Sequence, residues 1–477
     1  MGQEVNLTLF NADHFKTFFQ KLTEETQLLK KLIANRQFSE LAPTAGFEIE
    51  AWLIDDQMQA AANNISFLQN LNDPLAFPEL AKFNIELNGI PQKLTGNVLS
   101  TLHQNLTQTW EKSCLHAQQL NNHILIIGTL PTLKPSDMTL LNMSDMNRYR
   151  VLNEQILKAR GKPINLDIVG IEHLKFDHDD VMLESATTSL QLHTQVPFDT
   201  AHHFYNASII ASAAIVASCA NAPYLFGKNL WHESRIPLFE QAIETGGYGG
   251  AVHGPLKRVS FGSDFARNSI MECFQENLDH FPVLLPELFN GPIEQFEHLR
   301  LHNGTIWRWN RPLIGFDDDN TPHIRIEHRT PSAGPTIIDS IANAAFYYGL
   351  TKNLSDEITD QGLPLAFAQA KDNFYQAARF GLDSNIVWFD GNKQNLQKII
   401  LADLLPRARK GLHSLNLDSA DIDSYLTIIE QRIASKKTGS QWQRLFMQQP
   451  NATLQTMTQA YLEHQYSELP VSQWAIS

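Results

Sequence analysis

Four segments of this chain alternate between apolar and polar residues with the period of two that places alternate side chains on opposite faces of a β-strand. In each segment one face is apolar and the other is rich in acids, amides or arginines. The pattern predicts an antiparallel sheet that packs its apolar face against helices and leaves a polar face for chemistry. The four segments are 46–52, 83–88, 187–196 and 323–330.

The residue types on the polar faces distinguish a functional site from an ordinary solvated sheet. A sheet with water on one face is the simpler alternative, and it explains polar alternation in any single strand. Solvated strands, however, favour Thr, Lys and mixed charge, whereas these faces contain no Lys. The residues that repeat on them are Glu48, Glu50, Glu86, Gln191, His193, Arg325, Glu327 and Arg329.

These side chains suit phosphoryl chemistry. Glu48 and Glu50 point the same way from one strand and repel each other unless a cation or a proton lies between them, and carboxylate oxygens suit Mg²⁺. Arginines neutralise a transferring phosphoryl group, and His193 and Gln191 can add a metal ligand or a phosphate contact. We therefore expect metal ligands at Glu48, Glu50, Glu86, His193 and Glu327, and catalytic arginines at Arg325 and Arg329.

Other ways of handling a nucleotide or a nucleic acid are disfavoured. The net charge of −14 repels phosphate backbones and anionic lipid, which argues against nucleic-acid and membrane partners. No GxxxxGK[ST] pattern is present, and the glycine-rich stretch 246–250 is not followed by the Lys and helix start of a P-loop. That stretch is either a surface loop, which we favour, or a lid over the site.

The cysteines and the N-terminus indicate a cytoplasmic protein. Cys114, Cys219 and Cys273 are far apart and form no CxxC pattern, so neither a disulfide framework nor a zinc site is expected. The first fifteen residues lack the basic and apolar regions of a signal peptide.

Helical periodicity predicts the rest of the architecture. Segment 11–35 is expected to be an amphipathic helix capped by Asn11. We divide the chain into a catalytic domain, 1–380, and a helical C-terminal region packed on it, 381–477. Segment 395–462 has a helical pattern, with turns near Pro406 and 437–439. Further helices are expected at 145–160, 204–222, 233–244 and 335–350.

The motifs then resemble a known family. The Gly46-x-Glu48-x-Glu50 segment resembles the opening strand of the glutamate-cysteine ligase superfamily, in its bacterial carboxylate-amine ligase branch. The resemblance continues in the same order along the chain, through 84–88, 189–193, 233–235, 258–262, 325–329 and 334–336.

The resemblance implies an α+β fold of the glutamine synthetase/guanido kinase-like type. In it a curved antiparallel sheet forms a funnel for ATP and Mg²⁺, with helices packed outside. By the same resemblance Glu48, Glu50, Glu86, His193 and Glu327 match metal ligands, and Gln191, His193 and Arg329 match nucleotide contacts. Arg235 and Arg329 match arginines near the phosphoryl group or the acid substrate.

The activity that the resemblance implies is an ATP- and Mg²⁺-dependent carboxylate-amine ligase. The γ-carboxylate of glutamate would be phosphorylated, and cysteine or another amine would attack the acyl phosphate, a reaction of the kind used in glutathione biosynthesis. Small molecules are thus the expected partners, and a homo-oligomer is left open. A glutamate- or nucleotide-binding sensor and a kinase of the same fold are the alternatives.

A tryptophan-rich segment leaves a choice between core and site. Trp307, Trp309 and Arg311 are candidates for a wall of the substrate pocket. Aromatic residues on a strand belong more often to the core, so we favour the core for them.

Overall fold

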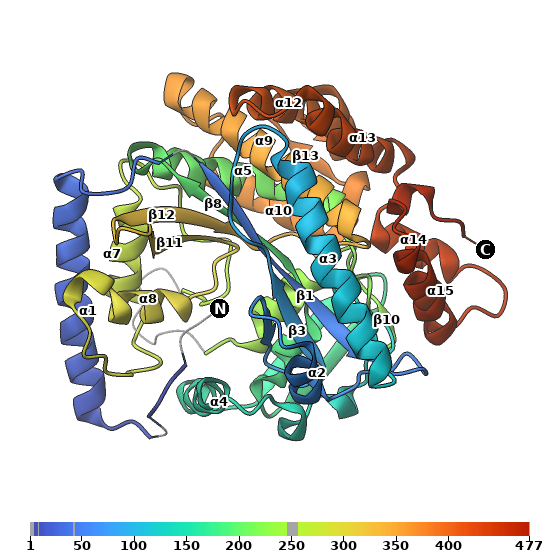
Figure 1. The fold of residues 1–477 in the computed structure, drawn as a ribbon, viewed down its shortest axis with the longest axis horizontal. Coiled ribbons are helices and arrows are strands. Elements are labelled where there is room, and N and C mark those ends of the chain that lie inside the picture. Colours follow the sequence, from blue (N-terminus) through green and yellow to red (C-terminus); the bar gives the residue numbers. More distant parts are fainter. Residues whose placement is uncertain (1–3, 8, 42, 246–255, 477) are drawn as a thin grey trace.

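The computed structural model describes residues 4–7, 9–41, 43–245 and 256–476 and is built around one eight-stranded antiparallel sheet (Figure 1). The order along its main path is β11-β12-β8-β1-β3-β2, and β4 and β5 also pair with β1. The strands are β1 (Thr44–Ile54), β2 (Ala76–Pro78), β3 (Asn84–Asn88), β4 (Gln92–Lys93), β5 (His123–Leu125), β8 (Leu190–Val196), β11 (Asn310–Phe316) and β12 (Pro322–His328).

The four predicted strands are therefore confirmed, and they lie next to one another as β12, β8, β1 and β3. Their register places the polar residues side by side, because Glu48 pairs with Gln191 and Glu50 pairs with Glu86. Across the next pair of strands Glu327 lies opposite His193. Residues far apart in the sequence thus meet on one face of the sheet.

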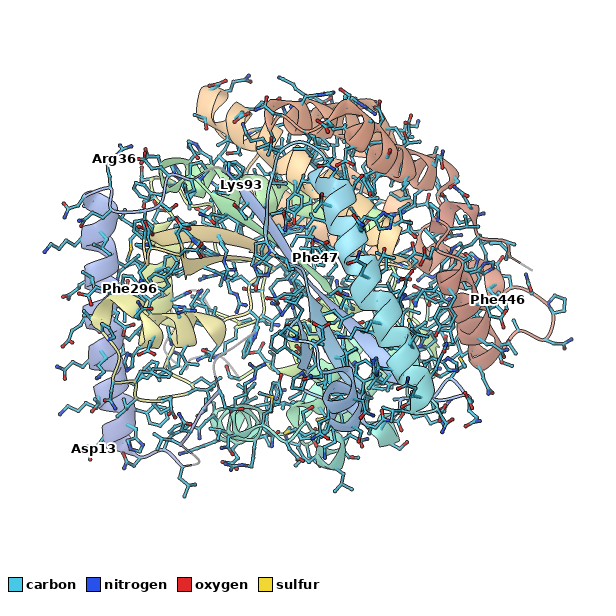
Figure 2. The ribbon with its side chains drawn as sticks, viewed as in Figure 1. Asp13, Arg36, Phe47, Lys93, Phe296 and Phe446 are labelled. Carbon is cyan, nitrogen blue, oxygen red and sulfur yellow. The ribbon has the colours of Figure 1, made fainter. Side chains whose placement is uncertain are left out.

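The opposite face of the sheet is packed against helices. Phe47 and Ile49 of β1 are buried, and Phe47 lies near the centre of the molecule (Figure 2). The helices α5 and α9 pack on β8, β11 and β12. Nearly all of α5 is buried, as expected for a helix that is apolar all round.

One alternating position departs from the pattern. By strand alternation Trp52 shares the face of Glu48 and Glu50, but it is fully buried, and its ring stacks on Phe83. Its indole nitrogen donates to the carbonyl of Ile127 at 3.0 Å and to the hydroxyl of Thr188 at 3.1 Å. A buried indole N–H needs such acceptors, and the two bonds fix this end of the strand.

The expected helices are present, with shifted ends. The α1 helix begins after Asn11, which forms a capping box with His14. The helix expected at 335–350 continues to Gln361 as α9, because Leu354 and Ile358 extend its buried face. The helices before residue 381 are α1 (Ala12–Ala34), α2 (Asn64–Leu71), α3 (Val98–Gln119), α4 (Asn147–Arg160), α5 (Ala201–Ser218), α6 (Arg235–Ala242), α7 (Met271–His280), α8 (Glu297–Gly304), α9 (Ile337–Gln361) and α10 (Phe367–Phe380).

Within the described residues, the C-terminal region is helical except for one short hairpin, which precedes the segment 395–462 that was expected to be helical. Strands β13 (Asn385–Val387) and β14 (Lys393–Asn395) form that hairpin. The turn expected near Pro406 is wrong, because a π-helical turn runs directly into α12 and proline is tolerated in the first turn of a helix. The helices are α11 (Leu396–Ile399), α12 (Leu405–Ser414), α13 (Ser419–Ser435), α14 (Gly439–Phe446) and α15 (Leu454–Tyr466).

The C-terminal helices are tied to the rest of the chain by buried polar contacts. Arg432 of α13 pairs with Asp339 of α9 at 2.7 Å, and both side chains are almost fully buried. The hydroxyl of Tyr461 in α15 donates to the carbonyl of Ile126 at 3.0 Å.

The division of the chain at residue 380 stays a prediction. In the part of the chain that the structure describes, no helix is long and apolar enough to cross a membrane.

Candidate active site

A cavity of about 260 Å³ lies on the polar face of the sheet. It is lined by strands β1, β3, β8, β11 and β12 together with side chains from loops and from α4 and α8. The sequence-predicted residues that line it are Glu48, Glu50, Glu86, Gln191, His193, Arg325, Glu327 and Arg329. The sheet register therefore gathers every predicted site residue except Arg235.

Glu48, His193 and Glu327 form the tightest group in the cavity. One ligand atom from each lies within 4.8 Å of the others, which is close enough for one cation to contact all three. The Nε2 atom of His193 is 3.5 Å from a Glu48 oxygen and 4.0 Å from a Glu327 oxygen. Both ring nitrogens of His193 are buried without a hydrogen-bond partner among the described residues. Since buried polar atoms are normally bonded, this donor set fits a metal ion.

Arginines determine the charge state of Glu327. Burial alone would raise the pKa of this carboxyl, but the charges of Arg311 and Arg329 outweigh it and hold the pKa far below the usual range. Arg311 donates Nε and Nη2 to the two carboxylate oxygens at 2.8 and 3.0 Å. Glu327 is therefore ionised at neutral pH and ready to bind a cation.

A second acidic group lies in the same cavity around Glu50 and Glu86. Glu50 accepts hydrogen bonds from the Ser189 amide at 2.7 Å, the Ser189 hydroxyl at 3.0 Å and the Gln191 amide at 2.8 Å. Burial nevertheless raises the pKa of Glu50 to about 7, and Glu86 contributes to that rise. Burial and the charges of Glu48 and Glu79 raise the pKa of Glu86 well above its usual value.

The sequence reasoning missed three residues of this second group. Glu79 and Glu184 line the cavity, and burial together with the charge of Glu50 raises the pKa of each to about 7. Arg148 of α4 also lines the cavity, and it lies 4.5 Å from the centre of the Tyr149 ring. Glu79 follows β2, and Glu184 lies in the 3₁₀ helix Val181–Ala186, so no alternating pattern could have marked them. One carboxylate oxygen of Glu86 is buried and unpaired, which again fits a cation.

Arg325 of β12 and Arg329, which directly follows that strand, differ in their contacts. Arg329 donates to the side-chain carbonyl of Gln191 and lies 3.4 Å from Glu327. Arg325 has no ion-pair partner within the described part of the chain, and its buried Nε atom lacks a hydrogen-bond partner. An arginine that lines a cavity without a carboxylate partner can accept an anionic substrate.

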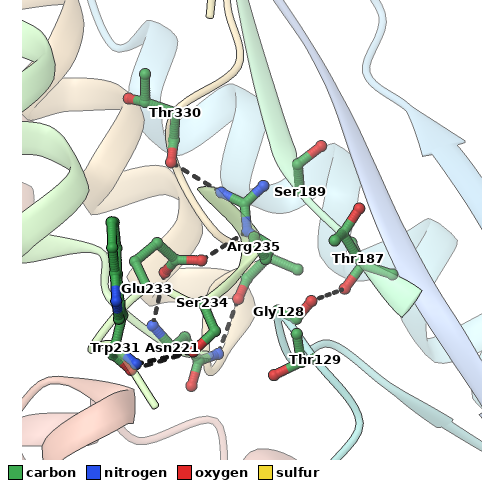
Figure 3. A network of polar contacts seen from close by, with 12 residues as sticks. Gly128, Thr129, Thr187, Ser189, Asn221, Trp231, Glu233, Ser234, Arg235 and Thr330 are labelled. Atoms are coloured by element: carbon green, nitrogen blue, oxygen red, sulfur yellow. Dashed lines mark hydrogen bonds and ion pairs between the residues drawn. The ribbon is translucent and has the colours of Figure 1, made fainter. Parts of the chain in front are cut away.

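Arg235 lies outside the cavity lining. Its Nε donates to Glu233 at 2.7 Å and its Nη2 donates to the carbonyl of Thr330 at 2.8 Å (Figure 3). Both members of this ion pair are almost fully buried. The pair of Glu233 and Arg235 thus holds the backbone at Thr330, directly after Arg329. The proposed site does not include Arg235.

The tryptophan-rich segment divides between site and core. Trp307 and Arg311 line the cavity, contrary to the core placement favoured for them, because Arg311 points to the polar face of β11 and reaches Glu327. Trp309 is buried as expected, and its indole nitrogen donates to Glu240 at 2.9 Å. The glycine-rich stretch 246–250 lies outside the described residues.

Comparison with known families identifies the chain. The model of glutamate-cysteine ligase family 2 matches residues 44–468, which is most of the sequence. The chain belongs to this family. Membership confirms the predicted resemblance and the predicted enzyme class, an ATP-dependent ligase of the glutamate-cysteine ligase type. A search of curated protein sequences finds no match.

The first of two similar solved structures confirms the fold. The chain resembles the glutamate-cysteine ligase of Francisella tularensis, solved in complex with AMP, with a TM-score of 0.57 and 12% sequence identity over 92% of this chain and 91% of that one. A bifunctional glutathione synthetase from Pasteurella multocida aligns with a TM-score of 0.49 and 12% identity, over 92% of this chain and 54% of that one. The predicted antiparallel funnel of the glutamine synthetase-like type is therefore confirmed.

Proposed function

We propose that the protein is a Mg²⁺-dependent carboxylate-amine ligase that joins glutamate to an amine through an acyl phosphate. The observation that carries the proposal is the cavity itself. It combines a cation-binding group, Glu48, His193 and Glu327, with Arg325, which has no ion-pair partner among the described residues. Such a combination binds the phosphates of ATP together with a carboxylate.

The acidic side chains would hold the metal. Glu48, His193 and Glu327 supply one set of ligand atoms, and Glu50 and Glu86, with Glu79 beside them, supply a second set. Bound Mg²⁺ would offset the phosphate charge of ATP and polarise the phosphoryl group. Without such cations, this cluster of carboxylates would repel the nucleotide.

In the proposed reaction, the cavity arginines bind the phosphoryl group while it is transferred. The γ-carboxylate oxygen of glutamate attacks the γ-phosphorus of ATP, the bond from phosphorus to the ADP oxygen breaks, and ADP leaves. Arg325 and Arg329 bind oxygens of the transferring phosphoryl group through their guanidinium N–H donors. The amine nitrogen then attacks the acyl carbon, loses a proton, and phosphate leaves with the former carboxylate oxygen.

A two-substrate assay tests the proposal. Purified protein with ATP and Mg²⁺ should release ADP and phosphate quickly only when an acid and an amine are both present, because an acyl phosphate shielded from water waits for its nucleophile. Glutamate is the first acid, and cysteine the first of a panel of amino acids and alkylamines. Mass spectrometry should detect a γ-glutamyl amide.

Two outcomes would contradict the proposal. Full ATP turnover in excess EDTA would exclude the metal role of the carboxylates. Phosphate release that never depends on any amine, with no amide product, would favour a sensor or a kinase of the same fold.

A further inference from the structure

A second cavity, of about 460 Å³, lies away from the catalytic one. It is formed where α10 ends, beside residues 170–171, Leu230, the β13–β14 hairpin and α14. Residues that line it include His232, Arg379, Ser384, Lys393 and Arg444, and it shares no lining residue with the catalytic cavity.

The charge of this second cavity is opposite to that of the whole protein. Arg379, Lys393 and Arg444 line it, and none of them has an ion-pair partner within the described ranges. Among the described residues, its lining contains one carboxylate, that of Asp383, which pairs instead with Lys436. Three cations without carboxylate partners on a chain of net charge −14 form a local positive field.

One of the positively charged groups, Arg444, is held in place by hydrogen bonds. Arg444 donates Nε to the side chain of Asn229 at 3.0 Å and Nη2 to the carbonyl of Leu230 at 2.9 Å, so the plane of its guanidinium group is fixed. Burial lowers the pKa of Arg444 to about 10, which still leaves it charged at neutral pH. The guanidinium group of Arg379 lies 5.8 Å from the Trp231 ring centre.

A buried hydroxyl gives an independent indication of a ligand. Ser384 is 2% exposed and lines the cavity, yet its Oγ atom has no hydrogen-bond partner in the described part of the molecule. The imidazole ring of His232 also lines the cavity. One of its nitrogens contacts the Ser440 hydroxyl at 3.3 Å. A buried hydroxyl without a partner is rare in folded proteins unless a ligand or an ordered water satisfies it.

We propose that this second cavity binds a metabolite-sized anion that carries at least two negative charges on phosphate or carboxylate groups. A fixed guanidinium group, a second arginine, a lysine and a free hydroxyl are donors typical of oxyanion sites. The volume exceeds what a single inorganic phosphate needs and is in the range of small-molecule pockets.

Titration calorimetry on the full chain without metal tests this site. The probes are glycerol 3-phosphate and citrate, each compared with NaCl at equal ionic strength. We expect at least one probe to bind, and its affinity to fall roughly tenfold or more in the double variant Arg379→Gln and Lys393→Gln, since charge-assisted hydrogen bonds are lost. Both residues are exposed, so the substitutions spare the core. The probe that binds identifies phosphate or carboxylate as the recognised group.

Two further variants locate the bound anion. Lys16→Gln removes an exposed charge on α1, on the opposite side of the molecule from α14 (Figure 1), and should leave the affinity unchanged. Arg325→Gln removes a cation from the catalytic cavity and should also leave it unchanged. The proposal is overturned if neither probe binds beyond the NaCl control or if the double variant binds normally. Loss of affinity in Arg325→Gln alone would overturn it too, since the anion would then occupy the catalytic cavity.

Discussion

Arg311 and Glu327 form a bidentate ion pair across the neighbouring strands β11 and β12, with N–O distances of 2.8 and 3.0 Å. The pair is buried on the polar face of the sheet, and Glu327 is also one of the three residues whose ligand atoms converge. Arg311 thus orients a carboxylate that would otherwise be free to rotate away from His193.

The first prediction concerns this pair. Arg311→Lys keeps the charge but loses the planar guanidinium group that donates two parallel hydrogen bonds. We therefore expect weaker Mg²⁺ binding and a fall in kcat of roughly tenfold or more. Kinetics as a function of Mg²⁺ concentration measure both effects. Arg409→Lys is the matched control, because Arg409 also forms an ion pair, with Asp423, but does not line the cavity. Equal behaviour of the two variants would remove the orienting role from Arg311.

The second prediction concerns the acidic ligands. Glu48→Gln and Glu327→Gln keep the shape of the side chain but remove a charge, so kcat should fall by roughly 10²-fold or more. Glu430→Gln, an exposed substitution on α13, controls for the change in net charge. A normal rate in both cavity variants would place the chemistry elsewhere.

The third prediction separates Arg329 from Arg235. Arg329 lines the cavity. Arg329→Lys should be nearly as damaging to turnover as Arg329→Ala, since the lysine ammonium group does not replace a planar guanidinium group with two parallel N–H donors. Arg235 forms a buried pair with Glu233, so Arg235→Ala leaves a buried charge unpaired and should cost about 3–5 kcal/mol of stability.

Thermal unfolding and turnover per folded molecule, measured on the same variants, decide between these roles. A stable Arg235→Ala protein with lost turnover would return Arg235 to the active site. An unstable Arg329→Lys protein with normal turnover per folded molecule would assign Arg329 to structure.

The fourth prediction is a pH dependence caused by Glu184. Burial first, and then the charge of Glu50, raise the pKa of Glu184 from 4.5 to about 7, so its neutral form is favoured in the fold. Its contribution to stability is complete below 4.5 and is lost as the pH rises through about 7. In metal-free protein, Glu184→Gln should therefore gain Tm relative to the natural chain, by roughly a few degrees, between about pH 5 and about pH 8. A Tm difference that is the same at both pH values would contradict this assignment.

The strand pattern predicted the sheet because burial of one face imposes a strict period of two. Glu48, Gln191, His193 and Glu327 were found in this way, since each lies on an alternating strand and the register brings them together. Trp52 broke the pattern at the end of β1, where its side chain is buried against Phe83 and bonded to Thr188.

Sequence periodicity could not predict the cavity residues that tertiary packing brings to the site. Glu79, Arg148 and Glu184 reach the cavity from a loop, a helix and a 3₁₀ turn, and only the folded chain brings them to Glu50. Arg235 shows that a motif match gives the residue type but not the direction of the side chain, since its guanidinium group pairs with Glu233 outside the cavity lining. The turn predicted near Pro406 was wrong, because in sequence a proline in the first turn of a helix looks the same as one that ends a helix.

Oxygen transfer from glutamate to phosphate tests the proposed mechanism most directly. Glutamate labelled with ¹⁸O in its γ-carboxylate is incubated with ATP, Mg²⁺ and the amine that supports turnover, and the released phosphate is analysed by mass spectrometry. If the carboxylate attacks the γ-phosphorus, one labelled oxygen leaves with each phosphate, and the other stays in the γ-glutamyl amide. Phosphate without label, formed while ADP accumulates at the same rate, would mean that water attacks ATP and would contradict the ligase mechanism.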